Sequence, residues 1–127
     1  MIVIICGDRN WTDEDTIDEY IKTLPPKSTI IHGNCRGVDK IAAKLGTIRG
    51  HRVIPNSAEW NKYGRWAGPI RNRHMLEEGK PDLVVAFHDD LSQSKGTSDM
   101  LGQAEARGIP TEVRRSSTSQ NPIRSDE

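Results

Sequence analysis

Residues 30 to 41, Ile-Ile-His-Gly-Asn-Cys-Arg-Gly-Val-Asp-Lys-Ile, carry the clearest structural signal in the chain, because an apolar strand stops at Gly33 and a helix begins near Gly37. The polar turn between them holds two glycines, an arginine and an aspartate. At such a junction the first N–H groups of the helix lack partners, and the helix dipole adds partial positive charge. The turn is therefore a predicted anion site, which its glycines let a phosphate approach closely.

Strand-like and helix-like segments alternate on both sides of this junction. Continuous apolar runs, typical of strands that are covered on both faces, occupy residues 2–6, 30–31, 52–54, 83–87 and 109–113. Helical patterns occupy residues 13–24, 38–49, 68–78 and 98–107. Five strands joined by four crossovers predict an α/β, three-layer Rossmann-like domain with a five-stranded, mostly parallel sheet. Ligands of such sheets bind beyond the carboxyl ends of the strands.

The whole domain is predicted to span residues 1–113. Residues 114–127 have almost no apolar content, so they are predicted to form a polar, disordered tail. Residues 55–65 are too many for a tight connection, and they include Trp60 and Tyr63, whose polar-edged rings could wall a pocket. This segment is predicted to form a rim or lid.

The balance of charge bears on the kind of ligand. Eighteen Lys and Arg balance eighteen Asp and Glu, which argues against a general nucleic-acid coat protein. Seven cations nevertheless lie in or beside the turns at the strand ends: Arg9, Arg36, Lys40, Arg65, Arg71, Arg73 and Lys95. A cationic pocket on a neutral protein favours a small anionic ligand.

The two cysteines, Cys6 and Cys35, form no Cys-x-x-Cys pair, and no histidines have helical i, i+4 spacing, so a structural metal is not expected. No secretory leader or membrane span is visible. The protein is therefore expected in the cytoplasm with reduced thiols. Both cysteines lie where predicted neighbouring strands end, so the two thiols could be close together, and it stays open whether they ever pair.

Four blocks of sequence, taken in order, resemble the SLOG superfamily, and most closely its YspA-like branch. They are Gly7–Thr12, His32–Asp39, Tyr63–Arg65 with Gly68–Arg73, and Ser94–Asp99. The second block is similar to the Ser-Gly-x-Ala-x-Gly-x-Asp turn of DprA/Smf. The resemblance implies binding of a nucleotide or nucleotide-derived small molecule at the carboxyl edge of the sheet, for sensing, sequestration or processing. It also implies no required cofactor or metal, and a homo-oligomer, either a dimer or a tetramer.

Two other functions follow from the same resemblance. LOG enzymes, which belong to this superfamily, hydrolyse the N-glycosidic bond of nucleoside monophosphates with an Arg and the Glu of a Gly-Gly-x-Gly-Thr-x-x-Glu motif. Arg71 would take the place of that Arg, and Asp99 or Asp89 would activate water; the chain keeps Gly96-Thr97 of the motif. The second alternative is single-stranded DNA binding as in DprA, against which the neutral net charge weighs.

The predicted ligand-binding residues are Gly7, Asp8, Arg9, Gly33, Arg36, Gly37, Asp39, Trp60, Tyr63, Arg71, Asn72, Ser94, Gly96 and Thr97. Each has a structural alternative. The glycines could serve only the turns, Asp39 could complement the helix dipole, and Thr97 could be a helix N-cap. The predicted catalytic residues are Arg71, Asp99 and Asp89, and the last of these has the alternative of a polar loop start.

Overall fold

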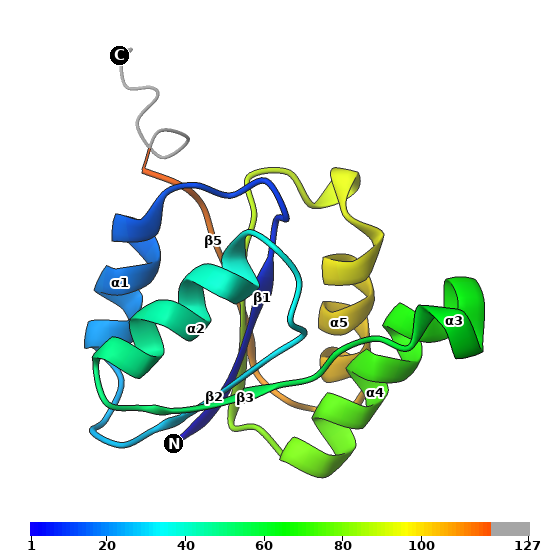
Figure 1. Cartoon of the computed structure of the whole chain (residues 1–127), viewed down its shortest axis with the longest axis horizontal. Coiled ribbons are helices and arrows are strands. Elements are labelled where there is room, and N and C mark those ends of the chain that lie inside the picture. The colour runs from blue at the N-terminus through cyan, green and yellow to red at the C-terminus, as the bar shows by residue number, and fades with distance from the viewer. Residues whose placement is uncertain (118–127) are drawn as a thin grey trace.

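A computed structural model describes residues 1–117 of the chain as an open sheet with helices on both faces (Figure 1). All five strands are parallel and lie in the order β3-β2-β1-β4-β5. Their bounds are β1 (Ile2–Gly7), β2 (Thr29–His32), β3 (Arg52–Pro55), β4 (Leu83–Phe87) and β5 (Thr111–Arg114). The predicted five-stranded parallel sheet is confirmed.

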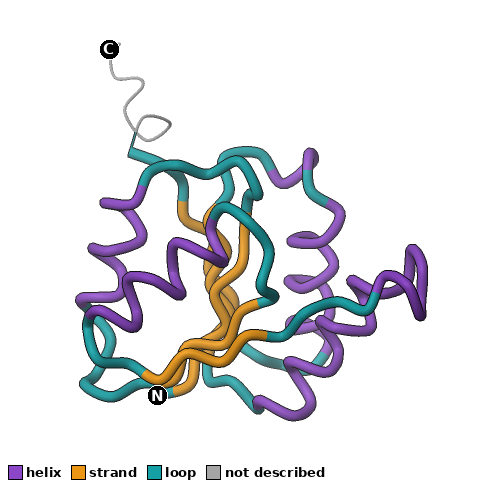
Figure 2. The backbone as a smooth tube through the Cα atoms, in the orientation of Figure 1, coloured by secondary structure: helices purple, strands orange, loops and turns teal. Residues whose placement is uncertain are grey.

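Helices cover the sheet in two pairs. α1 and α2 pack together on one face, and α4 and α5 on the other, as Figures 1 and 2 show. The helices are α1 (Glu14–Lys22), α2 (Val38–Ile48), α3 (Trp60–Tyr63), α4 (Ala67–Gly79) and α5 (Lys95–Ala106), with 3₁₀ helices at Gly64–Trp66 and Leu91–Gln93. This arrangement confirms the three-layer, Rossmann-like α/β fold. Within residues 1–117, every helix is too short or too polar to cross a membrane.

The central strand shows why both faces need a helical cover. Val3 and Ile5 belong to the apolar core beneath α1 and α2, whereas Ile4 belongs to the core beneath α4 and α5. All three side chains are fully buried, and each such burial stabilises the fold by roughly 1.5–3 kcal/mol. A strand with two buried faces has no polar side, which explains the continuous apolar run in the sequence.

The direction in which successive strands are added to the sheet reverses at β1. The chain leaves β1 for β2 on one side and later places β4 on the other side, so the loops after β1 and β4 diverge. Crevices open at the carboxyl ends of strands at such switch points. The two strand ends are close, since a Cβ on Gly7 would collide with the carbonyl oxygen of Phe87. The Asp8 amide donates a hydrogen bond to that same oxygen at 3.0 Å.

Several element ends differ from the sequence prediction. α5 begins at Lys95 rather than at residue 98, because Ser94 Oγ accepts a hydrogen bond from the Thr97 amide at 3.2 Å and caps the helix. Thr97 therefore lies inside the helix and is not its N-cap. Asp13 caps α1 in the same way and stands just outside it. The segment 55–65, predicted as a rim, contains α3 and part of a 3₁₀ helix.

The first residues of the predicted tail make contacts at the carboxyl edge. Arg114 is the last residue of β5, the Ser116 amide donates to the Asp89 carboxylate at 2.8 Å, and the Ser117 amide donates to the Asp13 carboxylate at 3.0 Å. The disorder predicted for the rest of the tail, residues 118–127, lies outside the described residues.

Candidate functional site

A cavity of about 620 Å³ opens at the carboxyl edge of the sheet. Its walls come from the loops after β1, β2 and β4, the first turns of α4 and α5, and the segment before α4. Of the predicted ligand-binding residues, twelve line it: Gly7, Asp8, Arg9, Gly33, Arg36, Asp39, Trp60, Arg71, Asn72, Ser94, Gly96 and Thr97. Asp99 lines it as well. The structure therefore gathers into one cavity residues that are far apart in the sequence.

The turn after β1 is ordered by Asp8. Its carboxylate accepts a hydrogen bond from the Asn10 amide at 2.9 Å, and its carbonyl oxygen accepts one from the Val38 amide at 3.2 Å. Arg36 reaches across from the next turn, where its Nε and Nη2 donate to the Arg9 carbonyl and the Asn10 side chain. The first two turns are thus joined, and they place Arg9 and Arg36 at the cavity.

The turn after β2 is filled by the side chain of Asp39. Its Oδ2 accepts hydrogen bonds from the Gly33 amide at 3.0 Å and the Cys35 amide at 3.2 Å. The intervening Asn34 amide donates to Nδ1 of His32. Several N–H groups of the predicted anion site therefore already donate hydrogen bonds within the protein.

Asp39 is a buried carboxyl in this cavity wall, with 5% of its surface exposed. Burial raises its pKa from 3.8 to about 6, although the Cys35 and Gly33 amides and the nearby charges of Arg71 and Arg9 act in the opposite direction. Within residues 1–117, no group donates a hydrogen bond to its Oδ1.

Arg71 joins three parts of the site. Its Nη1 donates to the Gly33 carbonyl at 2.6 Å and to the Asn56 carbonyl at 3.4 Å, and its Nε donates to the side chain of Asn72 at 2.9 Å. A guanidinium can hold several acceptors in fixed directions, so Arg71 ties α4 to the loops after β2 and β3. Arg73, two residues later on the helix, is exposed and lines a second cavity instead.

The other wall of the cavity is the start of α5, where Ser94, Lys95, Gly96 and Thr97 follow one another. Asn72, which is buried in α4, donates from Nδ2 to the Gly96 carbonyl at 3.2 Å and to Asp99 Oδ2 at 3.0 Å. These hydrogen bonds fix the first turn of α5 against α4.

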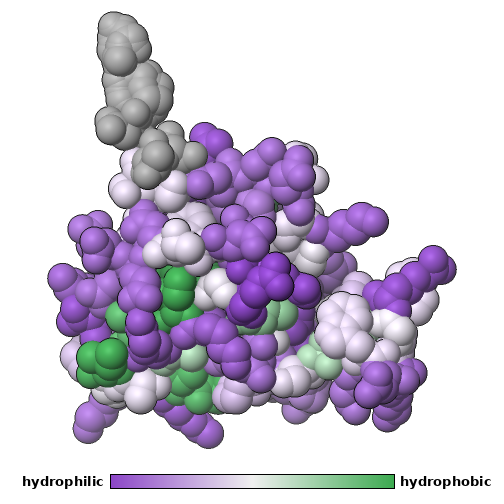
Figure 3. Space-filling model, turned by 45° about the horizontal axis from the view of Figure 1, so that its top comes forward, coloured by the Kyte–Doolittle hydropathy of each residue, from purple (hydrophilic) through white to green (hydrophobic). Residues whose placement is uncertain are grey.

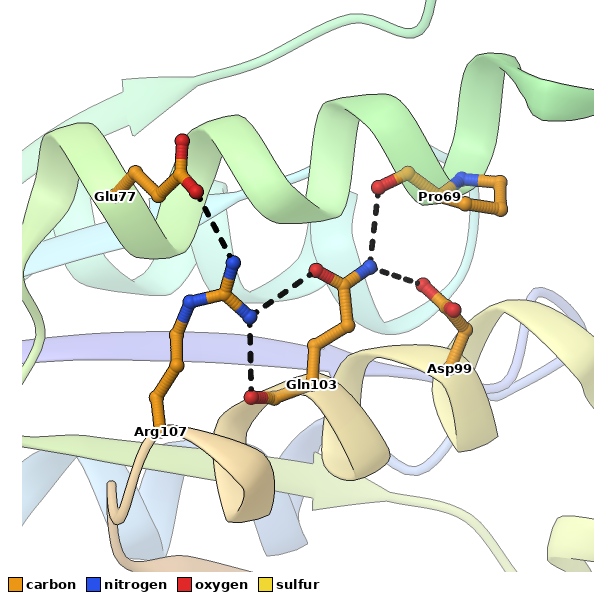
Figure 4. Close-up of polar contacts among 5 residues, drawn as sticks. All are labelled: Pro69, Glu77, Asp99, Gln103 and Arg107. Atoms are coloured by element: carbon orange, nitrogen blue, oxygen red, sulfur yellow. Dashed lines mark hydrogen bonds and ion pairs between the residues drawn. The ribbon is translucent and has the colours of Figure 1, made fainter.

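A chain of side chains between the two helices continues from Asp99 (Figure 4). Gln103 Nε2 donates to Asp99 Oδ2 at 2.8 Å and to the Pro69 carbonyl at 3.1 Å. Arg107 then bonds to Gln103 and to Glu77. Asp99 Oδ2 thus has two donors, whereas its Oδ1 accepts from no group in the described residues.

The tryptophans divide between this cavity and the core. Trp60 and Trp66 both line the cavity, and both are about half exposed. Trp11, in contrast, is buried and packs edge-to-face on Phe87, with ring centroids 5.8 Å apart. Trp66 was not among the predicted site residues, although it directly follows the segment that was predicted as a rim.

Three predicted site residues do not line the cavity. Gly37 lies behind its wall, where a Cβ would collide with the carbonyl oxygen of Asp8, and its φ of 77° is one that glycine tolerates. Tyr63 lines the second cavity. Asp89 holds Ser116, at the side of β5. The structure thus gives Gly37 a packing role in the turn and places Tyr63 and Asp89 elsewhere.

The cavity contains both thiols but no cluster of metal ligands. Cys6 and Cys35 line it, both are free, and burial raises the pKa of the Cys6 thiol. Among residues 1–117, no group of three or more His, Cys, Asp and Glu side chains could hold a metal ion.

Hydrophilic side chains cover most of the face seen when the carboxyl edge is turned toward the viewer (Figure 3).

Comparison with known proteins gives two matches. The model of the YspA, cpYpsA-related SLOG family matches residues 1–63. The Gene 61 protein of Mycobacterium phage D29 is 34% identical over 117 residues, which cover 85% of this chain and 91% of the phage protein. No solved structure matches the chain significantly.

Proposed function

The chain belongs to the YspA, cpYpsA-related SLOG family, and from this premise we propose that its cavity binds a nucleotide or nucleotide-derived small molecule. Family membership supports a nucleotide-related role in general. The position of the cavity supports the same proposal, because it opens at the carboxyl ends of parallel strands beside a switch point. Its volume of about 620 Å³ also lies within the usual range for small-molecule sites.

The single observation that carries the proposal is the state of the cations in this cavity. Five of them line it: Arg9, Arg36, Arg65, Arg71 and Lys95. In the described part of the chain none of the five belongs to an ion pair with a carboxylate. The lining holds only three carboxylates, those of Asp8, Asp39 and Asp99. An excess of unpaired cations in a concave site favours an anionic ligand.

The proposed anchor for the phosphate follows from which groups are already used. Asp39 occupies the amides of Gly33 and Cys35, so the turn after β2 offers its Arg36 guanidinium rather than these N–H groups. Arg9 and Lys95 donate no side-chain hydrogen bond to any group in residues 1–117. We assign the phosphate to these three cations, with the first turn of α5 beside Lys95 as a further donor surface.

A charge-matched pair of variants tests this assignment. Arg9→Ala removes a cation from the cavity, and Arg52→Ala removes an exposed arginine from the opposite, amino end of β3. Both variants change the net charge equally. Titration calorimetry with a nucleoside 5′-monophosphate should show binding weakened about tenfold or more in Arg9→Ala, because a charge-assisted hydrogen bond contributes roughly 1.5–3 kcal/mol. Arg52→Ala should bind as the wild type does.

Two results would count against the proposal. One is the absence of binding by any nucleoside mono-, di- or triphosphate. The other is an equal effect of the two substitutions, which would mean that only the overall charge matters.

A second function, hydrolysis of an N-glycosidic bond, is favoured by the geometry of Asp99. Asn72 and Gln103 hold its Oδ2, so the carboxylate has a fixed direction, and it lines the cavity. It could then activate water or stabilise a developing ribosyl cation, as the resemblance to LOG enzymes implies. Arg71 would hold the 5′-phosphate.

Asp99→Asn tests hydrolysis more cleanly than a change at Arg71, which also joins α4 to two loops. The amide oxygen that this substitution introduces could still accept from the same donors. If the protein is a hydrolase, chromatography of a nucleoside monophosphate reaction should show free base with wild type and none with Asp99→Asn. Base that never forms, or that forms equally with the variant, removes this function.

A further inference from the structure

The largest exposed aromatic side chains of the described protein gather at one place. The exposed large hydrophobic residues are Met1, Ile48, Trp60, Trp66 and Val113. Both tryptophans of this set line the cavity described above, with 50% and 58% of their surfaces exposed. Exposed tryptophan is costly in water, and two such rings in one cationic cavity point to a planar ligand group.

The two tryptophans are carried by a short segment, residues 60–66, which we call the arm. It consists of α3 and the 3₁₀ helix Gly64–Trp66, and it projects beyond the end of α4 (Figure 1). The Trp60 ring rests against the first turn of α4, where its Cη2 lies 3.5 Å from the position that a Cβ on Gly68 would take. This is an ordinary van der Waals distance, so the Trp60 ring lies against the first turn of α4 at the cavity wall.

Trp66 has a cation at its ring. The Arg65 guanidinium carbon lies 5.0 Å from the ring centroid, within cation–π distance, and Arg65 also lines the cavity. The pair therefore offers an aromatic ring with a positive charge over one of its two faces. A nucleobase with an attached phosphate has the complementary character, since its ring is planar and its phosphate is anionic.

We propose that Trp60 and Trp66 bind the heteroaromatic base of the ligand, while Arg9, Arg36 and Lys95 hold its phosphate. This inference rests on the proposed function and adds to it that the base, and not only the phosphate, is recognised. Stacking on an aromatic ring tolerates different bases because each has a π-face, so the arm selects for a base without fixing which one.

Tyr63 is the aromatic residue of the arm that this assignment leaves out. It lines the second cavity, and the Lys62 ammonium lies 5.1 Å from its ring centroid. A Tyr63 variant is therefore a control for the tryptophan variants, because it removes an aromatic ring from the arm but not from the first cavity.

The test compares two ligands that differ only in the base, a nucleoside 5′-monophosphate and ribose 5-phosphate. Wild-type protein should bind the first about tenfold or more tightly than the second. Trp66→Leu and Trp60→Leu should each reduce this preference severalfold and leave the affinity for ribose 5-phosphate unchanged. Tyr63→Leu should keep the full preference, and so should Ile48→Ala, which removes an exposed apolar group outside the cavity.

Fluorescence gives an independent readout of the same contact. Because Trp11 is buried in the core, quenching by the nucleotide should come from the two tryptophans of the arm, and ribose 5-phosphate should not cause it. Quenching should be weaker in each leucine variant than in wild type.

The outcomes distinguish this inference from the proposal on which it rests. If ribose 5-phosphate binds as tightly as the nucleotide and the tryptophan variants change nothing, the inference is wrong and phosphate binding stands. If neither compound nor any other nucleotide binds, the proposed function fails. Tryptophan variants that dissociate an oligomer in light scattering but keep the preference for the nucleotide would also overturn the inference, because the arm would then be an interface between copies of the chain.

Discussion

At the scale of single residues, Asp39 has the most unusual environment of the candidate site. Its carboxylate closes the turn after β2 from inside the protein, and burial raises its pKa to about 6. The folded protein therefore holds this proton more tightly than the unfolded chain does, whose pKa is near 3.8. The contribution of Asp39 to stability is greatest below the unfolded pKa and is lost as the pH rises through about 6.

Replacing Asp39 with asparagine should remove this pH dependence. The variant keeps an oxygen for the Gly33 and Cys35 amides but carries no charge. We expect its free energy of unfolding to match that of wild type near pH 4 and to exceed it near pH 8 by up to about 3 kcal/mol, since each pKa unit corresponds to about 1.4 kcal/mol. Urea denaturation of both proteins at several pH values measures this difference. A difference that stays constant with pH would show that Asp39 ionises normally.

Arg71 offers a second prediction at this scale, because its fork of donors and not only its charge joins the site. Arg71→Lys keeps the charge but cannot reach the Gly33 and Asn56 carbonyls and Asn72 together. We expect a loss of about 1–3 kcal/mol in unfolding free energy, as buried acceptors lose their donor. Arg73→Lys, on the exposed side of the same helix, should lose less than about 0.5 kcal/mol. Equal losses in the two variants would contradict this role.

At the scale of elements, α5 packs against the sheet and also forms one wall of the cavity. Its two glycines, Gly96 and Gly102, allow these two roles to be tested separately. A Cβ on Gly96 or on Gly102 would meet nothing within 4 Å. Alanine at either position should therefore stabilise the protein by about 0.5–1 kcal/mol through helix propensity. Only Gly96 lines the cavity, so only Gly96→Ala should weaken nucleotide binding.

Thermal unfolding and ligand titration of both alanine variants check the prediction for α5. Gly102→Ala serves as the control for helix stability. If Gly96→Ala binds nucleotide as tightly as Gly102→Ala does, the ligand does not approach the first turn of α5.

The elements also show what the sequence can and cannot predict. β4 was predicted with its observed bounds, because an uninterrupted run from Leu83 to Phe87 is buried on both faces. The start of α5 was missed, because Ser94 and Thr97 are both plausible N-caps and only the three-dimensional turn selects Ser94. α3 was missed for a different reason. It has no buried residue, so no apolar periodicity marks it.

The candidate site was predictable to a similar extent. Ligands bind at the carboxyl ends of parallel strands, and most of the residues predicted from this rule line one cavity. The rule does not say which side chains fill the turns from within, so the occupation of the Gly33 and Cys35 amides by Asp39 could not be foreseen. Nor does the rule say in which direction the aromatic side chains of residues 60–66 point. The sequence therefore did not predict that Trp66, rather than Tyr63, lines the cavity.

At the scale of the whole molecule, charge distinguishes a small-molecule site from a nucleic-acid groove. The chain has no net charge, and five cations line one cavity that holds three carboxylates. A polyanion that neutralised many cations along a groove would lose about 10³- to 10⁵-fold in affinity between about 50 and 200 mM salt. One phosphate group held in a cavity releases far fewer counterions.

We therefore expect the affinity for a nucleoside monophosphate to fall by about tenfold or less over this salt range. A single-stranded oligonucleotide should bind no more tightly than the mononucleotide at either salt concentration, because the proposed contacts are to one base and one phosphate. Fluorescence titrations of the two ligands at both salt concentrations decide the matter. If the oligonucleotide binds much more tightly at low salt, with a steep salt dependence, the binding site is an extended basic surface rather than the cavity. That result would favour single-stranded DNA binding.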